Sequence, residues 1–461
     1  MRRLNFWLTM AILAGLLLAA PALAATTIKQ TIINNSGYPD NQVYLVFYGK
    51  LNSEIGTTAV GTFHRLDWPT GNFPAMKATD NTTDFSKHVP VPDPILYADY
   101  SIALDKLARD PISGQRFFNL PTVTDTTKGF YSGRLYVSFL NPVYIRVTDP
   151  KNISQPAYNP IARDVNTVLK TVYDFFEPAI DKDLKVWADT TNVDAVGMPL
   201  LYELRNGATL LGGPKGLALP LLTVRGAFLR DPVLKDLVLS TMIIAPGHAI
   251  ENGKISSTYI DKFTKYITHC WGVWTSTHKL SITYDGVNWT GFVSSDILTL
   301  SGTVNSATET HTIKHPTPKD VFECNGAFDA GTPPNPEPDG WTSRDKDLKN
   351  QVGSALNRTV MHLDPYPNGQ TDFPWQAYLA GYNKNVFYGQ NGLTAAQFAT
   401  NIYSKLLHQL CYDGVNIYGF AYDDNCNIST TITGYGDNLI LTIRDCTGLP
   451  TPYVNLNLLL D

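Results

Sequence analysis

The sequence predicts a mainly β protein, a barrel or sandwich of short strands, with a mixed α/β section inserted into it. Three observations carry this prediction. Alternating apolar and polar residues recur in short runs through the first half of the chain, helical periodicity begins near Arg225, and strand patterns return after residue 410. Aromatic residues make up 11% of the 461 residues, and strands favour such residues.

The first half is expected to form a barrel or sandwich domain over residues 25–224. The run "NNSGYPDNQVYLVFYGKL" (Asn34–Leu51) places a cluster of turn residues before an alternating strand pattern. "SGRLYVSFLNPVYIRV" (Ser132–Val147) repeats the pattern, with Asn141-Pro142 as a break. The stretch Asp67–Pro94 is rich in Pro, Thr, Asn and Asp and is expected to be a long surface loop.

Residues 225–410 are expected to form a mixed α/β domain. "RGAFLRDPVLKDLVLSTMIIAP" (Arg225–Pro246) has a helical period followed by a short β-branched run, and "STYIDKFTKYITHCWGVW" (Ser257–Trp274) repeats this helix-then-strand order. The proline-rich segment Gly331–Trp341 reads as a loop. The clearest helix spans Thr394–Gly414, with Thr394 as a candidate N-cap.

Two strand patterns close the chain, "VNIYGFAYDD" (415–424) and "NLILTIRD" (438–445). They predict that residues 411–461 rejoin and complete the first domain.

The first 24 residues read as a cleaved signal peptide. A basic start is followed by an apolar run from Phe6 to Ala20 and by a small-residue cleavage site ending at Ala24. The apolar run is too short for a comfortable membrane span. The mature protein is therefore expected to be secreted, extracellular or periplasmic, with no membrane association after cleavage.

Charge and cysteine content limit the classes of partner and cofactor that the protein is expected to have. The formal net charge is −5 and only 17% of residues are charged, with no basic block, which argues against nucleic acid and anionic membranes. A lightly charged, Tyr-rich exported protein suits a neutral polysaccharide, although a β-rich core explains the aromatics equally well. The five cysteines predict one or two disulfides with one thiol left over. Neither cysteine nor histidine spacing resembles a metal site, so no metal and no cofactor are expected.

Carboxylates are the best candidates for catalysis, because the sequence has no G-x-S-x-G, no P-loop and no dinucleotide-binding glycine pattern. In "YDFFEPAI", an extended backbone places Tyr173, Phe175 and Glu177 on one face. An aromatic surface withdraws water from a carboxylate and raises its pKa, as a general acid requires.

A second carboxylate lies downstream in "TTNVDAVGMP". A strand there would place Asn192 and Asp194 on one face, where neighbouring polar donors keep an aspartate ionised, as a general base should be. The alternative is that both acids are ordinary solvated residues at strand edges. With 41 acidic residues in the chain, spacing alone does not separate the two interpretations.

"FFEPAID…ADTTNVDAVGMP" resembles the signature of glycoside hydrolase family 64, inverting endo-β-1,3-glucanases related to thaumatin-like proteins. Shorter similarities lie in "NNSGYPDNQVYLVFYG", "SGRLYVSF", "IIAPGH", "ALNRTV" and "YGFAYDDN". The resemblance implies a thaumatin-like β-barrel or sandwich domain, an inserted α/β domain and a wide groove between them. It further implies Glu177 as general acid, Asp194 as general base, β-1,3-glucan as substrate and a monomer that needs no metal or cofactor.

The resemblance also implies substrate-binding residues. Asp423 and Asp424 are expected to line the cleft, with one of the two facing it because adjacent strand residues point to opposite sides. Weaker candidates for contact with sugar are Asp181, Thr191 and Asn192.

The roles of two tryptophans, and the effect of one proline on catalysis, have alternative interpretations. Trp187 and Trp289 are candidates for stacking on glucose, or are packed in the core. Pro178-Ala179 follows the acid where the family tends to have an aromatic residue and Thr. This departure keeps open a second function, a non-catalytic thaumatin-like protein that binds β-glucan or another partner.

Overall fold

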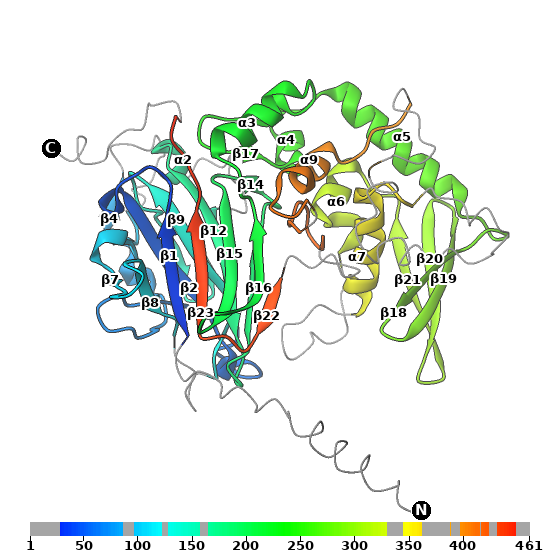
Figure 1. Cartoon of the computed structure of the whole chain (residues 1–461). Coiled ribbons are helices and arrows are strands. Elements are labelled where there is room, and N and C mark those ends of the chain that lie inside the picture. The colour runs from blue at the N-terminus through cyan, green and yellow to red at the C-terminus, as the bar shows by residue number, and fades with distance from the viewer. Residues whose placement is uncertain are drawn as a thin grey trace, which may run out of the picture.

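The computed structural model describes most of the chain outside its two ends. It shows two regions, one of β-sheets and one in which helices pack around a four-stranded sheet (Figure 1). The residues described are 28–85, 96–121, 128–156, 165–329, 344–361, 388, 397–414, 416–423 and 431–448. The expected signal peptide and the loop Gly331–Trp341 lie outside them.

A six-stranded sheet contains strands from both ends of the chain. Its order is β16-β15-β23-β1-β8-β7, and β23 runs parallel to β1, beside which it lies in Figure 1. The C-terminal strand pattern therefore returns to the first part of the chain. The bounds are β1 Lys29–Asn34, β7 Ala108–Arg109, β8 Arg116–Asn119, β15 Leu200–Asn206, β16 Thr209–Gly216 and β23 Asn438–Ile443.

A seven-stranded antiparallel sheet faces the first one. Its order is β22-β13-β12-β9-β2-β3, with β6 also paired to β2. The bounds are β2 Val43–Leu51, β3 Phe63–Arg65, β6 Ile102–Ala103, β9 Phe130–Phe139, β12 Val172–Ile180, β13 Val186–Thr190 and β22 Ile432–Gly434. The strands predicted within Asn34–Leu51 and Ser132–Val147 are β2 and β9, so the mainly β prediction is confirmed.

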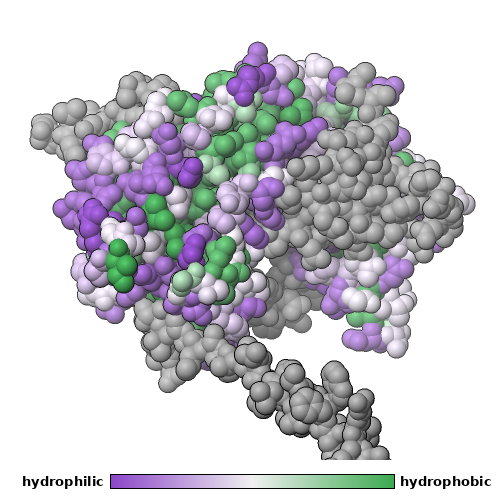
Figure 2. All heavy atoms as spheres, viewed as in Figure 1, coloured by the Kyte–Doolittle hydropathy of each residue, from purple (hydrophilic) through white to green (hydrophobic). Residues whose placement is uncertain are grey.

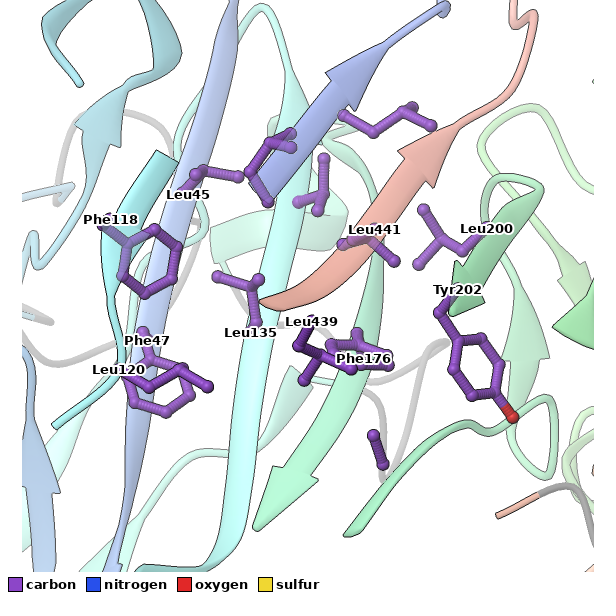
Figure 3. Packing of buried hydrophobic residues seen from close by; sticks show 14 of the residues in the cluster. Leu45, Phe47, Phe118, Leu120, Leu135, Phe176, Leu200, Tyr202, Leu439 and Leu441 are labelled. Atoms are coloured by element: carbon purple, nitrogen blue, oxygen red, sulfur yellow. The ribbon is translucent and has the colours of Figure 1, made fainter. Parts of the chain in front are cut away.

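The main hydrophobic core fills the space between these two sheets. Figure 3 shows side chains from both sheets meeting there, including Phe47 and Phe176 from one sheet and Leu439 and Leu441 from the other. All four are fully buried. Strand alternation sends every second residue of β12 into this core, which leaves the residues between them on the opposite face.

A second core lies in the helical region. Strands β18 (Leu280–Tyr284), β19 (Val287–Ser294), β20 (Ile297–Val304) and β21 (Ala307–Lys314) form a four-stranded meander. Each hairpin turns through two residues with positive φ, the conformation that tight hairpins need; the pairs are Asp285-Gly286, Ser295-Asp296 and Asn305-Ser306. Helix α5 (Ser257–Val273) and helices α6 (Pro318–Glu323) and α7 (Arg344–Asn357) share this core.

A third core joins the two regions. It packs the outer face of the seven-stranded sheet against helices α3 (Leu221–Arg230) and α9 (Ile402–Leu410) and against the short paired strands β14 (Ala195–Val196) and β17 (Ile243–Ile244). Helix α4 (Pro246–Glu251) follows β17 directly. This junction places the connection between β13 and β14 against the helical region.

The remaining elements are short. They are β4 Thr83–Asp84, β5 Leu96–Tyr97, β10 Val147–Asp149, β11 Asn152–Ile153 and α2 Val165–Val168, together with 3-10 turns at Asp40–Gln42, Asn52–Glu54, Ala78–Asp80, Leu104–Lys106, Lys235–Leu237 and Gly326–Phe328. No helix in the described ranges has both the length and the apolar character needed to cross a bilayer.

Several sequence predictions are corrected here. The helix expected over Thr394–Gly414 begins only at Ile402, and Asn401 caps it by accepting a hydrogen bond from the Ser404 amide. Thr394 lies outside the described residues. The helix-then-strand order expected over Ser257–Trp274 is wrong, because α5 continues to Val273. Residues 416–423 form turns rather than the expected strand.

The disulfide prediction is also wrong for four of the five cysteines. Cys270, Cys324, Cys411 and Cys446 are buried thiols that form no disulfide. Cys446, Cys270 and Cys411 lie one in each of the three hydrophobic cores described above, where each packs as a small apolar side chain. Cys324 is buried at the C-terminus of α6. Cys426 lies outside the described residues.

Candidate functional site

A cavity of about 550 Å³ lies where the seven-stranded sheet meets the helical region. Its size falls within the range of roughly 300–1,000 Å³ that is usual for ligand pockets. Aromatic residues Phe175, Tyr418 and Tyr422 form part of its wall. Its charged and histidine residues are Arg134, Glu177, Asp194, His248, Glu251, Lys319 and Glu323. On the face of the molecule in Figure 2, hydrophilic residues cover much of the surface and hydrophobic ones form smaller groups between them.

Glu177 enters this cavity from the outer face of β12. Its neighbours Phe176 and Pro178 are buried, whereas the Glu177 side chain keeps 30% of its surface exposed. Arg134 on β9 donates a hydrogen bond from Nε to Oε1 of Glu177 at 3.1 Å, and its guanidinium lies over the ring of Phe175. The predicted alternation of β12 is confirmed.

The environment of Glu177 favours its protonated form. Burial raises the pKa of the Glu177 carboxyl, the nearby Arg134 guanidinium opposes this rise, and the negative charge of Asp194 adds to it. The net direction is upward. A carboxyl with a raised pKa is suited to give a proton to a leaving oxygen.

Pro178 fits inside β12 because the pairing with β9 is irregular there. The ladder shifts register between Phe176 and Ile180. A Cβ on Gly133 of β9 would lie 2.2 Å from the Pro178 carbonyl oxygen, so this edge of Pro178 faces β9. The missing N–H of proline therefore falls where the ladder is already interrupted. The departure at Pro178 leaves Glu177 in the cavity.

Asp194 lies in the bend between β13 and β14, not on the continuous strand that the sequence suggested. Its backbone carbonyl accepts a hydrogen bond from the Ala245 amide at 2.9 Å, next to the pairing of Ala195 with Ile244. Its Oδ1 lies 3.1 Å from Nε2 of His248, and 20% of its side chain is exposed. A bend allows this carboxylate to point into the cavity from outside the sheet plane.

Asp174 on β12 binds the chain that follows Asp194, just after β14. Its Oδ2 accepts hydrogen bonds from the amides of Gly197 and Met198 at 2.9 and 3.1 Å, and its Oδ1 accepts one from Phe175. Burial raises the pKa of the Asp174 carboxyl to about 7, although these amides favour the charged form. Asp174 faces away from the cavity and fixes the path of the chain after Asp194.

Beyond Asp194, His248 begins a chain of charged groups. Its buried Nδ1 has no hydrogen-bond partner among the residues that the structure describes and lies 3.7 Å from Oε2 of Glu251. Lys319 joins two carboxylates, with Nζ 2.9 Å from Glu251 and 3.0 Å from Glu323. His248, Glu251 and Glu323 bring one potential metal ligand each within 4.8 Å of one another. The Lys319 ammonium already supplies a positive charge between the two carboxylates.

The three weaker predicted binding residues occupy different positions relative to the cavity. Thr191 lines the cavity. Asn192 is buried, with its amide bonded to the Tyr418 carbonyl and its carbonyl to the Tyr403 hydroxyl, so it ties two segments of the wall together. Asp181 caps the β12–β13 turn by accepting from the amides of residues 183 and 185. It does not line the cavity.

Asp423 is placed differently from the expectation. Its side chain has no exposed surface, so it does not contact a sugar in the cavity. It accepts hydrogen bonds from Arg358 and His408 at 3.0 Å each and from the Gly419 amide at 2.9 Å. Asp423 therefore anchors residues 416–423, which carry Tyr418 and Tyr422 to the cavity. Asp424 lies outside the described residues.

The two tryptophans also differ from each other. Trp289 is fully buried in the second core, whereas 42% of Trp187 is exposed on β13. Lys185 places its ammonium over the Trp187 ring at 4.4 Å. Packing in the core is thus the outcome for Trp289.

Sequence reasoning missed several residues of the cavity. Arg134, His248, Glu251, Lys319 and Glu323 were not candidates. For Arg134 and His248, the only signal in the sequence was that each lies in a stretch that resembles the family, "SGRLYVSF" and "IIAPGH" respectively. The two glutamates and Lys319 have no such signal, because they reach the cavity only through the packing of α4 against α6.

Comparison with known proteins places this geometry in a family. The sequence model of glycoside hydrolase family 64, described as β-1,3-glucanase, matches residues 26–442. Proteins named glucan endo-1,3-β-glucosidase from Cellulosimicrobium cellulans and from Arthrobacter sp. (strain YCWD3) are each 28% identical. The aligned parts cover 95% of this chain and 69% of each relative.

Solved structures agree on the fold. A β-1,3-glucanase domain of family 64 from Clostridium beijerinckii superposes with a TM-score of 0.69 at 22% identity, over 92% of this chain and 100% of that one. A laminaripentaose-producing β-1,3-glucanase in complex with laminaritetraose gives a TM-score of 0.61 at 20% identity, over 91% and 99%.

Proposed function

The chain belongs to the β-1,3-glucanase family, glycoside hydrolase family 64, and on that premise we propose that it cleaves β-1,3-glucan with Glu177 as general acid and Asp194 as general base. Family membership makes the protein an endo-β-1,3-glucanase. One observation supports the residue assignment: Glu177 and Asp194 reach a single cavity from two different elements.

The proposed reaction uses the different environments of the two acids. Glu177, whose pKa is raised, gives its proton to the glycosidic oxygen as the bond to the anomeric carbon breaks. Asp194 takes a proton from a water molecule that attacks the anomeric carbon from the opposite face. An inverting enzyme needs about 6.5–9.5 Å between the two carboxyl groups to leave room for this water. The product then has the α configuration.

The solved relative that contains laminaritetraose supports a β-1,3-linked oligosaccharide as the cavity's ligand. We place the sugar at the cleavage point between Glu177 and the β13–β14 bend, with Tyr418 and Tyr422 as further wall residues. The groove and the thaumatin-like relationship implied by the sequence are part of this proposal. So are export by the first 24 residues and action as a monomer.

Substitution of the two acids tests the assignment. Glu177→Gln and Asp194→Asn are each expected to lower the release of reducing sugar from soluble β-1,3-glucan by about a thousandfold, within the 10²- to 10⁴-fold contribution of a single proton-transfer group. Asp183→Asn changes an exposed acid and Glu309→Gln a half-buried one, both outside the cavity, and they serve as controls. Full activity in Glu177→Gln would remove Glu177 from the mechanism. Glucan binding without any hydrolysis by the unmodified protein would favour the non-catalytic alternative.

The stereochemical claim has its own test. Proton NMR of the first sugar released is expected to show the α anomer before mutarotation. A first-formed β anomer would mean a double displacement, with Asp194 acting as a nucleophile instead.

A further inference from the structure

One short segment holds Asp194 at two points. Within residues 243–248, Ile243 and Ile244 pair with β14, and the Ala245 amide donates a hydrogen bond to the Asp194 carbonyl. Three residues after Ala245, His248 reaches back from α4 to Oδ1 of the same aspartate at 3.1 Å. The backbone and the side chain of Asp194 are therefore both fixed by a single stretch of chain. This arrangement leaves the carboxylate few alternative orientations.

The direction of the His248 hydrogen bond follows from chemistry. An ionised carboxylate only accepts hydrogen bonds, so Nε2 of His248 must carry the proton. Oδ1 of Asp194 is thus occupied. Within the described residues, Oδ2 accepts no hydrogen bond, and the side chain retains exposed surface toward the cavity. Oδ2 is the oxygen left to contact water.

We propose that His248 is a positioning residue for Asp194, which fixes Oδ1 so that Oδ2 faces the attacking water. This inference rests on the assignment of Asp194 as general base. His248 itself takes no proton from the water in this scheme, because Nε2 already donates to the carboxylate. Its contribution is to the orientation of the base and to its ionised form.

The charges around His248 favour its imidazolium form. Burial lowers the pKa of His248, but the hydrogen bond and charge of Asp194, together with the charges of Glu323 and Glu251, outweigh it and raise the pKa. Lys319 faces the same group from α6 and neutralises part of the two glutamates. The raised pKa favours a positive charge on His248 beside Asp194, in addition to the hydrogen bond.

Two substitutions separate the hydrogen bond from the charge. His248→Phe keeps a ring of similar size and removes the donor, and kcat is expected to fall about 10- to 100-fold with KM little changed, since a charged hydrogen bond is lost. His248→Gln keeps an N–H near the position of Nε2 and is expected to recover most of this loss. Its acidic limb of kcat against pH should move to higher pH, because no positive charge remains beside Asp194. His315→Gln, which changes a histidine that does not line the cavity, is the matched control.

Coupling to Asp194 gives the decisive measurement. In the Asp194→Asn background, His248→Phe is expected to cause no further loss of kcat, because residues that act as a unit are non-additive. The same loss in both backgrounds would overturn the inference, as would a higher KM with unchanged kcat, which indicates direct contact with glucan. Thermal melting of each variant checks that it is folded. If the His248→Phe variant is not folded, the pH profile of the folded His248→Gln variant tests the inference instead.

The outcomes also separate this inference from the proposed function. Full activity of Asp194→Asn would remove the base assignment itself. An inactive Asp194→Asn together with a His248→Phe variant as active as the unmodified enzyme would leave the base assignment standing and refute only the role of His248.

Discussion

Arg134 donates a hydrogen bond to Glu177 at 3.1 Å, so the carboxyl proposed as the general acid is also one half of an ion pair. A guanidinium favours the ionised carboxylate, whereas a general acid must hold its proton. Burial and the charge of Asp194 act in the opposite direction and prevail, so the pKa of Glu177 is raised. Arg134 therefore limits how far this pKa rises.

Replacement of Arg134 is expected to shift the pH dependence. In Arg134→Met the opposing charge is lost, so the pKa of Glu177 rises further and the alkaline limb of kcat/KM moves to higher pH. Measured kcat/KM from pH 4 to pH 9 reports this shift. Arg134→Lys keeps a positive charge at the same place and is the control. An equal shift in both variants would mean that loss of packing, not loss of charge, is responsible.

A small anion should replace the proposed base. Asp194→Ala removes the carboxylate and leaves space beside the anomeric carbon. Azide needs no deprotonation, so it is expected to attack directly while Glu177 protonates the departing oxygen, and turnover should recover as azide is added. Mass spectrometry and NMR should identify an α-glycosyl azide. Recovery in Glu177→Gln rather than in Asp194→Ala would reverse the assignment of base and acid.

Asp174 should make stability depend on pH. In the unfolded chain this carboxyl titrates near 3.8, and in the folded protein its pKa is about 7, because burial disfavours its charge. Between these values the folded state holds the extra proton, so this group's contribution to stability is complete below about pH 4 and is lost as the pH rises toward 7. Thermal melting of the unmodified protein and of Asp174→Asn over this range should show a flatter dependence for the variant.

Asp174 also has a structural role that a second substitution measures. Asp174→Ala leaves the amides of Gly197 and Met198 buried without their acceptor. A cost of about 1–3 kcal/mol per unsatisfied group is expected, which denaturant unfolding at pH 7 can detect. Unchanged stability would show that water or a backbone shift satisfies these amides.

Asp423 should affect stability more than binding. It is paired with Arg358 and His408, and none of the three side chains is exposed. Removing one partner of a buried ion pair typically costs about 3–5 kcal/mol, so Asp423→Ala is expected to unfold at a markedly lower denaturant concentration. The exposed Asp183→Asn change is the control. A large rise in KM without loss of stability would instead restore Asp423 as a sugar-binding residue.

The strand content was readable from the sequence because period-two alternation is a local signal. Val43–Leu51 and Phe130–Phe139 are long, apolar and flanked by turn residues, and both form strands. The start of the helix near residue 400 was placed too early, because the N-cap is Asn401 and not Thr394. The strand expected from the alternation of residues 415–424 does not form over 416–423, where the buried hydrogen bonds of Asp423 hold the chain as turns.

Only some of the residues that line the cavity could be predicted from the sequence. Glu177 stands out because it projects from an aromatic strand, and Asp194 because it lies in a distinctive motif, yet its placement depends on a bend that periodicity does not reveal. The pairing of Arg134 with Glu177 could not be predicted, because it depends on the register between β9 and β12. Lys319 and Glu323 reach the cavity by helix packing between segments far apart in the sequence, which no local pattern encodes.

Each of the three hydrophobic cores described above contains a buried thiol: Cys446 between the two large sheets, Cys270 in the helical region and Cys411 at the junction. Cys324 is buried at the C-terminus of α6. Burial raises the pKa of the Cys270, Cys324 and Cys446 thiols, so an alkylating reagent reacts with them only when the surrounding segment opens. Peptide mapping of the alkylated chain at increasing denaturant would then reveal the order in which the three cores come apart, with reporters that the natural sequence already contains.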